Sequence, residues 1–126
     1  MSKKPLVLIA EDNELNLKLF SDLLEVKGLD YIGVSDGNKV LEVAKKRLPD
    51  LILMDIRLNG VSGLDIVDEI KSDPSLKDIP IIALTAFAMK NDKAKTISHG
   101  CSGYLAKPVT VDLFFETIDQ FIKVEA

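Results

Sequence analysis

The chain has 126 residues, of which 47% are hydrophobic and 29% charged, and its formal net charge is -4. This length suffices for one domain with a buried core that needs no disulfide or structural metal. The acidic balance offers no attraction to phosphate backbones, which argues against nucleic acid as a direct partner. The single cysteine, Cys101, excludes an internal disulfide, and no apolar run is long enough for a signal peptide or for membrane insertion. We therefore expect a cytoplasmic protein that forms one domain over residues 1–126.

Five short apolar runs predict β-strands. In chain order they cover residues 5–10, 31–34, 51–56, 79–85 and 103–106. The runs lack the alternation of apolar and polar residues that marks a sheet with one wet face. Most of these strands are therefore expected to be buried on both faces, as in a sheet that carries helices on each side.

The segments between and after these strands show helical spacing of apolar residues. The predicted core-facing residues are Leu15, Leu19 and Leu23 with Phe20 and Leu24 beside them, then Val40, Leu41, Ala44 and Leu48, then Ile66, Val67 and Ile70, and last Val111, Phe114, Ile118, Phe121 and Ile122. A weaker pattern over 88–98 predicts the least firmly packed helix.

Capping residues agree with this division. Asp12 or Asn13, Asp36 and Ser62 are candidate N-caps, and Gly28 can end the first helix in a left-handed conformation. Strict alternation of five strands with five helices predicts an α/β fold with a parallel sheet and right-handed crossovers. At this size the expected architecture is a flavodoxin-like, doubly wound sheet with strand order 2-1-3-4-5.

Polar residues lie at or directly after the ends of four of the five strands. Glu11 and Asp12 close the first, Asp55 the third and Thr85 the fourth, and Lys107 follows the fifth. Parallel strands end at the same edge of a sheet, so these side chains should share a small pocket. Two carboxylates about 5 Å apart repel each other by roughly 3 kcal/mol at an effective dielectric of 20. Folding alone does not favour such a cluster.

A divalent cation among the acids would relieve this repulsion, and oxygen ligands with room for water suit Mg²⁺. Taken one at a time, the acids are better interpreted as helix caps or solvated loop residues, but together at strand ends they favour a metal site. Asp55 is then the candidate nucleophile toward phosphorus, with Glu11 and Asp12 holding the metal. Thr85 and Lys107 can donate hydrogen bonds to phosphoryl oxygens.

Short motifs in a fixed order complete the pattern. They are "EDN" after the first strand, "LILMDI" at the third, Gly63 eight residues past Asp55, "ALTA" at the fourth and "KP" after the fifth. Over essentially the whole chain these motifs resemble the CheY-like receiver domain of response regulators in two-component signalling. The segments "EDNELN", "KLF", "DLLE" and "TAFAMK" are further similar to single-domain receivers that act in cell-cycle or developmental control.

The resemblance implies a role for each acid. Asp55 would accept a phosphoryl group from a histidine kinase or a phosphotransfer protein. Mg²⁺, for which Mn²⁺ can substitute, would be ligated by Asp12, by Asp55 and by the backbone carbonyl of Arg57, with Glu11 acting through water. The protein would assist its own phosphorylation and slow autodephosphorylation, but would not be an enzyme for a separate substrate.

The resemblance also implies a switch. Lys107 would contact the phosphoryl group, Pro108 would follow a cis peptide bond, Thr85 would move inward on activation, and Tyr104 would act as the switch aromatic. The output would be a changed surface that downstream proteins, including kinases or their adaptors, recognise. A monomer or weak homodimer without an output domain is expected.

Asn59 stands where receivers often have proline, four residues past the acceptor, and this loosens the loop without touching the chemistry. Arg57 and Phe87 occupy the positions whose side chains flank the attacking water in this family. These two side chains leave the lifetime of the phosphorylated form open.

Three other functions compete with this interpretation. Phosphatases of the haloacid dehalogenase type also form an aspartyl phosphate, but their D-x-D motif is broken here by Arg57. An interaction module that has lost phosphorylation should lack a member of the site, and none is missing. The chain could also be a receiver cut from a longer regulator, against which the initial Met and the lack of a trailing linker argue mildly. Outside the site, His99 is predicted to face solvent and Cys101 to be a packing residue.

Overall fold

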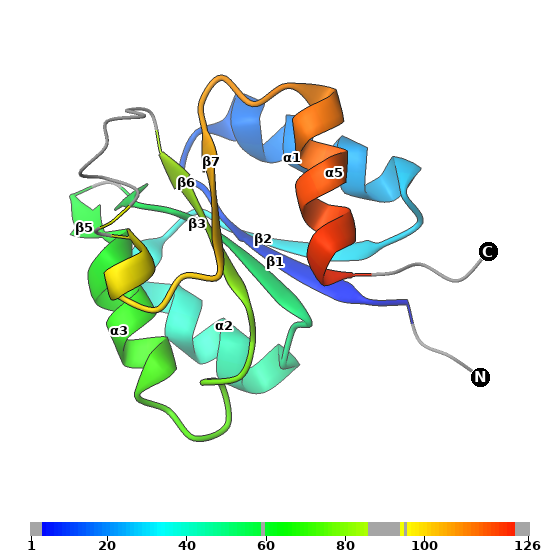
Figure 1. Cartoon of the computed structure of the whole chain (residues 1–126). Helices are drawn as coiled ribbons and strands as arrows, with labels where there is room; N and C mark the ends of the chain where they lie inside the picture. Colours follow the sequence, from blue (N-terminus) through cyan, green and yellow to red (C-terminus); the bar gives the residue numbers. More distant parts are fainter. Residues whose placement is uncertain (1–3, 59, 86–93, 95, 123–126) are drawn as a thin grey trace.

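A parallel sheet of five strands lies between two layers of helices in the computed structural model, which describes residues 4–58, 60–85, 94 and 96–122 (Figure 1). Its order is β2-β1-β3-β6-β7, formed by β1 (Leu6–Ala10), β2 (Asp30–Val34), β3 (Leu51–Asp55), β6 (Ile81–Thr85) and β7 (Gly103–Ala106). Counted among themselves along the chain, these strands have the order 2-1-3-4-5. The predicted flavodoxin-like fold is confirmed.

Helices cover both faces of the sheet. Helices α1 (Glu14–Val26) and α5 (Val111–Phe121) pack on one face, and α2 (Val40–Arg47) and α3 (Gly63–Lys71) pack on the other (Figure 1). A short 3₁₀ helix, η1 (Gly37–Lys39), leads into α2. Because these helices cover the two faces of the sheet, a ligand can approach the sheet at the ends of its strands.

Alternate residues of the central strands belong to two separate cores. In β3, Ile52 and Met54 pack with residues of α2 and α3, whereas Leu51 and Leu53 pack with those of α1 and α5. The strands β1, β3 and β6 are almost wholly buried, as predicted. The strand β2 is mostly exposed, because it is an outer strand of the sheet.

The helix ends follow capping chemistry. The side chain of Asn13 accepts a hydrogen bond from the Asn16 amide at 3.0 Å and starts α1, and Asp36 caps η1 in the same way. Ser62 is the N-cap residue of α3 but makes no capping bond through its side chain. Gly28, with φ at 77°, follows the end of α1, as predicted.

The predicted core-facing side of α1 is partly wrong. Leu15 is 80% exposed and Leu19 is 42% exposed, whereas Phe20 and Leu24 are buried. The ring of Phe20 stacks on the ring of Phe114 in α5, with 5.4 Å between the centroids. Leu15 and Leu19 lie on one side of the helix, and Phe20 and Leu24 lie on the side next to it. The contact between Phe20 and Phe114 turns the second side toward the sheet.

Two other predicted core residues are also exposed. Leu48 follows α2 in a left-handed conformation with φ at 47°, so its side chain leaves the stripe that Val40 and Ala44 bury. Val111 occupies the first position of α5, ahead of the buried Phe114. Both errors arise at helix ends, where helical spacing no longer describes the direction of a side chain.

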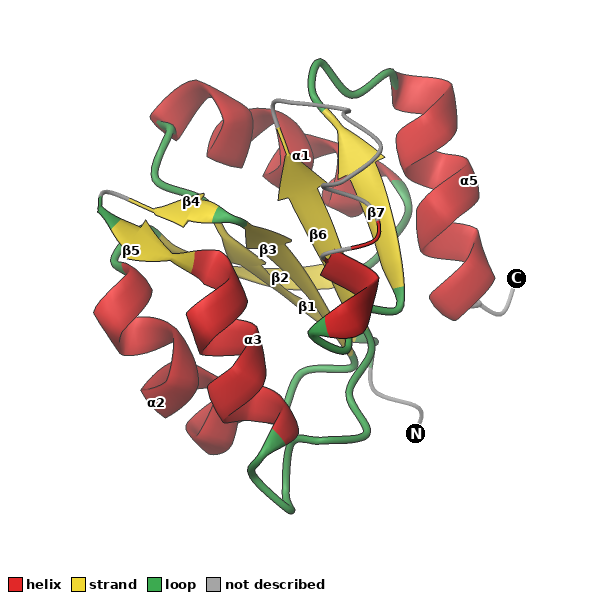
Figure 2. Cartoon of the chain, turned by 60° about the vertical axis from the view of Figure 1, so that its left-hand side comes forward, coloured by secondary structure: helices red, strands yellow, loops and turns green. Residues whose placement is uncertain are grey.

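A small hairpin after β3 is an element that the apolar pattern did not predict. Strands β4 (Arg57–Leu58) and β5 (Val61–Ser62) pair antiparallel, apart from the main sheet (Figure 2). Gly60 lies in the turn with φ at 82°. Strands of two residues are too short for periodicity to reveal.

The predicted fourth helix is described only in part. Ala94 and residues 96–98 are helical, and the remaining positions of 88–98 lie outside the described residues. Within the described parts of the chain, no helix combines the length and the apolar character that a membrane crossing requires.

Candidate metal and phosphoryl site

The carboxyl ends of β1, β3, β6 and β7 bring the predicted site residues to one edge of the sheet. Asp55 is the last residue of β3 and lies beside Leu84 of β6, and Thr85 ends β6 beside Ala106 of β7. Glu11 follows β1 and continues its ladder, because its amide donates to the Val34 carbonyl at 3.1 Å. The strand register therefore sets the spacing of the site.

Three acids meet at this edge. Glu11, Asp12 and Asp55 each offer a carboxylate oxygen, and these oxygens all lie within 4.8 Å of one another. Glu11 is fully buried, Asp55 is 6% exposed and Asp12 is half-buried. Clustered carboxylates with partial access to water are the donor set that Mg²⁺ prefers, so these residues fit the predicted cation.

Lys107 joins two of the acids. Its Nζ atom lies 2.8 Å from Asp55 Oδ2 and 2.9 Å from Glu11 Oε2. Burial acts to lower the pKa of Lys107, but its hydrogen bonds to Asp55 and Glu11 outweigh this effect and raise the pKa above its usual 10.5. The ammonium group therefore stays charged and offsets part of the negative charge of the cluster.

The negative charge of Glu11 is costly, because this carboxylate is buried. Burial raises the pKa of Glu11 to about 7, and the nearby charge of Asp55 adds to the rise, while the hydrogen bond from Lys107 opposes it. The Glu11 Oε1 atom also accepts the amide of Asn13 at 3.2 Å. A buried carboxylate that favours its neutral form gains from a further positive charge, which agrees with a cation site.

The chain around Asp55 is held by backbone contacts. The Arg57 amide donates to Asp55 Oδ1 at 2.9 Å, and the Gly63 amide donates to the Ile56 carbonyl at 3.0 Å. A Cβ atom on residue 63 would lie only 2.2 Å from the Asp55 carbonyl oxygen. Gly63, which the sequence marked by its spacing, is thus required by the close approach of two backbone segments.

The predicted switch residues lie on β6, on β7 and directly after β7. Thr85 is buried at the end of β6, and its carbonyl accepts the Lys107 amide. Tyr104 is half-buried on β7 and packs against the core on the α2 and α3 side. The bond between Lys107 and Pro108 is cis, as the resemblance implied. Asn59 and Phe87 lie outside the described residues.

One contact between side chains was missed by the sequence interpretation. His99 was predicted to face solvent, but its side chain is 27% exposed and its Nδ1 atom lies 2.7 Å from Asp68 Oδ1 on α3. No local pattern reveals this contact, because the two residues are 31 positions apart. It joins α3 to the chain ahead of β7, away from the acid cluster.

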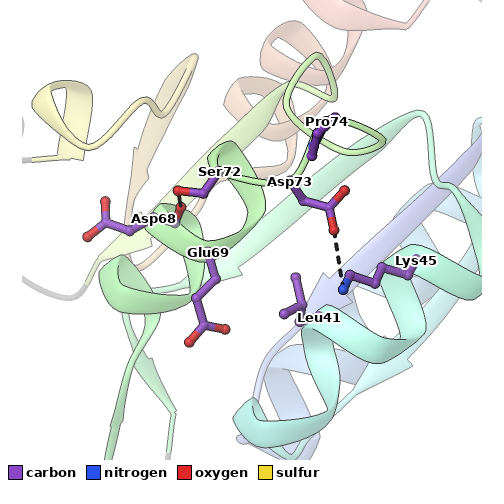
Figure 3. Close-up of a pocket in the computed structure, with 7 residues that line it drawn as sticks. All are labelled: Leu41, Lys45, Asp68, Glu69, Ser72, Asp73 and Pro74. Atoms are coloured by element: carbon purple, nitrogen blue, oxygen red, sulfur yellow. Dashed lines mark hydrogen bonds and ion pairs between the residues drawn. The ribbon is translucent and has the colours of Figure 1, made fainter.

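A pocket of about 450 Å³ lies elsewhere, between α2 and α3 (Figure 3). Its lining residues are Leu41, Lys45, Asp68, Glu69, Ser72, Asp73 and Pro74. Lys45 and Asp73 form an ion pair of 3.3 Å across it. None of the acid cluster lines this pocket, so it is separate from the candidate site.

Cys101 is a packing residue, and its reactivity should reflect this. Burial raises the pKa of its thiol from 9.0 to about 11, so at pH 8 the thiolate fraction falls about a hundredfold. We expect iodoacetamide to alkylate Cys101 at least about a hundredfold more slowly in the native protein than in urea. Alkylation kinetics followed by mass spectrometry would measure both rates, and equal rates would contradict the burial.

The chain belongs to the family of the response regulator receiver domain, whose family model matches residues 7–119. Receiver domains are signalling domains that interact with histidine kinases or phosphotransfer proteins and bind Mg²⁺ at an acidic cluster. Among its relatives are the polar-differentiation response regulators DivK of Brucella anthropi and Brucella ovis. Each is 48% identical over 116 residues, which is 92% of this chain and 94% of the relative.

Solved structures agree with this family. The receiver domain of a sensor histidine kinase from Pseudomonas aeruginosa PAO1 is 30% identical, with a TM-score of 0.86 over 94% of this chain and 98% of that one. It was solved with a magnesium ion coordinated in its active site cleft. The Vibrio cholerae chemotaxis protein CheY4, at 23% identity and a TM-score of 0.89 over 95% of this chain and all of its own, shares the fold.

Proposed function

We propose that this protein is a magnesium-dependent phosphoacceptor, in which Asp55 takes a phosphoryl group from a histidine kinase or a phosphotransfer protein. The observation that carries this proposal is the meeting of three carboxylates and one lysine at the end of β3. Asp55 contacts Lys107, shares the cluster with Glu11 and Asp12, and is the acid that ends the central strand β3.

Asp12, Asp55 and the backbone carbonyl of Arg57 are the proposed ligands of Mg²⁺ or Mn²⁺, and Glu11 acts on it through water. The cation supplies positive charge that neutralises the phosphoryl oxygens. Both ions accept oxygen ligands of this kind. The magnesium in the related Pseudomonas receiver supports this assignment.

The transfer needs little covalent chemistry from the protein. A carboxylate oxygen of Asp55 bonds to phosphorus while the N–P bond of a phosphohistidine breaks and its electron pair stays on the imidazole. Lys107 already lies on Asp55 and offsets the added charge, and Thr85 provides a hydroxyl group at the neighbouring strand end. Slow autodephosphorylation follows when water attacks phosphorus and releases inorganic phosphate and the carboxylate.

The output is a change of surface. A phosphoryl group favours the form in which Thr85 has moved toward it and Tyr104 has turned inward, so the population shifts to that form. Tyr104 is half-buried on β7, which pairs with the strand β6 that ends at Thr85. This position supports a coupling between the movements of Thr85 and Tyr104. Downstream proteins, including kinases or their adaptors, would recognise the altered face.

The biological setting is proposed from the relatives. Their name, polar-differentiation response regulator, supports a role in developmental or cell-cycle control. We further propose that residues 1–126 act as one receiver domain, as a monomer or weak homodimer. The buried free thiol of Cys101 supports a reducing, cytoplasmic location.

Acetyl phosphate in the presence of Mg²⁺ tests the function directly. Intact-mass and peptide mass spectrometry are expected to detect one phosphoryl group, on Asp55, that is stable in acid and labile in base. EDTA should abolish the modification, because the acids then repel the incoming phosphate, and Mn²⁺ should restore it. Modification at another residue, or none, would count against the proposal. Rapid turnover of generic phosphate esters would instead favour the phosphatase alternative.

A further inference from the structure

We propose that the buried Gly37 of η1 is a positioning residue for the metal site. Its missing side chain leaves the space into which Val61 of β5 packs, and this contact places the hairpin that carries the Arg57 carbonyl. The inference rests on the proposed function of that carbonyl as a metal ligand. It concerns a loop that follows β2 and contributes no side chain to the acid cluster.

Close approach, and not backbone conformation, requires glycine at this position. A Cβ atom on residue 37 would lie 3.1 Å from both Cβ and Cγ1 of Val61 and 3.4 Å from Cδ1 of Ile66. Gly37 is not among the glycines with positive φ, so its backbone geometry is open to any residue. An added methyl group must therefore displace η1, Ile66 or Val61.

The 3₁₀ helix is poorly able to move away. Asp36 Oδ1 accepts the Asn38 amide at 3.0 Å, and the Asp36 carbonyl accepts the Lys39 amide at 3.0 Å. Val40 follows directly and is fully buried in the core under α2. Because the residues on both sides of Gly37 are fixed, we expect Val61 to move and not η1.

On that side, Val61 is tied to the metal loop. It pairs with the fully buried Leu58, and Ser62 pairs with Arg57 (Figure 2). The Arg57 amide in turn donates to Asp55 Oδ1 at 2.9 Å. Leu58 cannot shift without opening the core. A displacement of Val61 therefore moves the backbone of Arg57, including its carbonyl group. Mg²⁺ demands near-ideal octahedral ligand geometry, and small displacements of a ligand lower its affinity.

Gly37→Ala tests the inference, with Gly33→Ala as its matched control. A Cβ atom on residue 33 would lie 2.9 Å from Leu17 Cδ1, the end of a flexible side chain on the α1 side of the sheet. Both variants add one methyl group to a crowded glycine, but only residue 37 touches the hairpin. The readouts are the Mg²⁺ dissociation constant, from NMR shifts of the Arg57 amide, and the melting temperature without Mg²⁺.

Gly37→Ala is expected to weaken Mg²⁺ binding about tenfold, while Gly33→Ala leaves it within about twofold of the wild type. Adding Val61→Ala to Gly37→Ala removes the contact with Cγ1 but keeps the contact with the Cβ atom of residue 61, so the affinity should recover in part, to within about fivefold of the wild type. If Gly37→Ala does not fold, Val61→Ile, which crowds the same contact from the hairpin, should weaken Mg²⁺ binding in its place.

Three results would overturn the inference: unchanged Mg²⁺ affinity in Gly37→Ala, an equal loss in Gly33→Ala, or no recovery in the double variant. A wild-type protein that binds no Mg²⁺ would overturn the proposed function itself, and this outcome is visible before any variant is compared.

Discussion

Asp55→Asn is expected to abolish phosphoryl acceptance while the protein stays folded. An amide is a far weaker nucleophile toward phosphorus than a carboxylate, and asparagine keeps the shape of a side chain that is only 8% exposed. The Lys107 ammonium keeps Glu11 as a partner at 2.9 Å, so the substitution leaves no buried cation unpaired. Intact-mass spectrometry after acetyl phosphate treatment should show no modified protein, and thermal unfolding should shift by only a few degrees.

Asp12→Asn is the matched control, because it removes an acid from the same cluster but keeps the proposed acceptor. It should slow phosphorylation and raise the Mg²⁺ requirement about tenfold or more, with recovery at high Mg²⁺. Asp55→Asn should not recover at any Mg²⁺ concentration. Phosphorylation of Asp55→Asn at the wild-type rate, or identical behaviour of the two variants, would contradict the separate roles of acceptor and ligand.

Gly63→Ala is expected to be the most destabilising single methyl addition in the site. Its Cβ atom would lie 2.2 Å from the Asp55 carbonyl oxygen and 2.7 Å from Ile56 Cα. Both atoms belong to the backbone of the acceptor strand and its exit, so no side-chain rotation relieves the overlap. We expect a loss of about 3 kcal/mol, which corresponds to roughly 10 °C in melting temperature, together with weaker Mg²⁺ binding.

Gly60→Ala separates this overlap from ordinary glycine strain. Gly60 has φ at 82°, but among the described residues no crowding atom lies within 4 Å of where its Cβ would be, so alanine there should cost only about 1 kcal/mol. Urea and thermal unfolding of both variants measure the difference. If Gly63→Ala and Gly60→Ala unfold at the same midpoint, the backbone contact between residues 63 and 55 is not the constraint that the distances indicate.

Much of the fold was predictable because its signals are local. The runs that became β1, β3 and β6 are apolar throughout, and each stops at a polar residue where the strand leaves the core. In a parallel sheet the carboxyl ends of the strands lie on the same side, so the polar residues at these ends come together. The cluster of Glu11, Asp12 and Asp55 is therefore predictable from the order of the strands. The roles of these residues stay predictions until phosphorylation is measured.

Other features depend on contacts between distant segments and could not be predicted from local patterns. Leu15 and Leu19 look like core residues until Phe20 stacks on Phe114, which is 94 positions away. The crowding of Gly37 by Val61 likewise arises only after the hairpin has packed on η1. Helical spacing describes one element at a time, whereas the rotation of a helix and the fit of a loop are decided by their neighbours.

The exposure of Leu15 and Leu19 separates folding from recognition on α1. Since neither side chain lies in the core, polar substitutions there carry little cost in stability. Yet α1 begins two residues after Asp12, so a protein that delivers phosphate to Asp55 must approach this first part of the helix. These positions can therefore change with little loss of stability, and such changes can alter which protein delivers phosphate to Asp55.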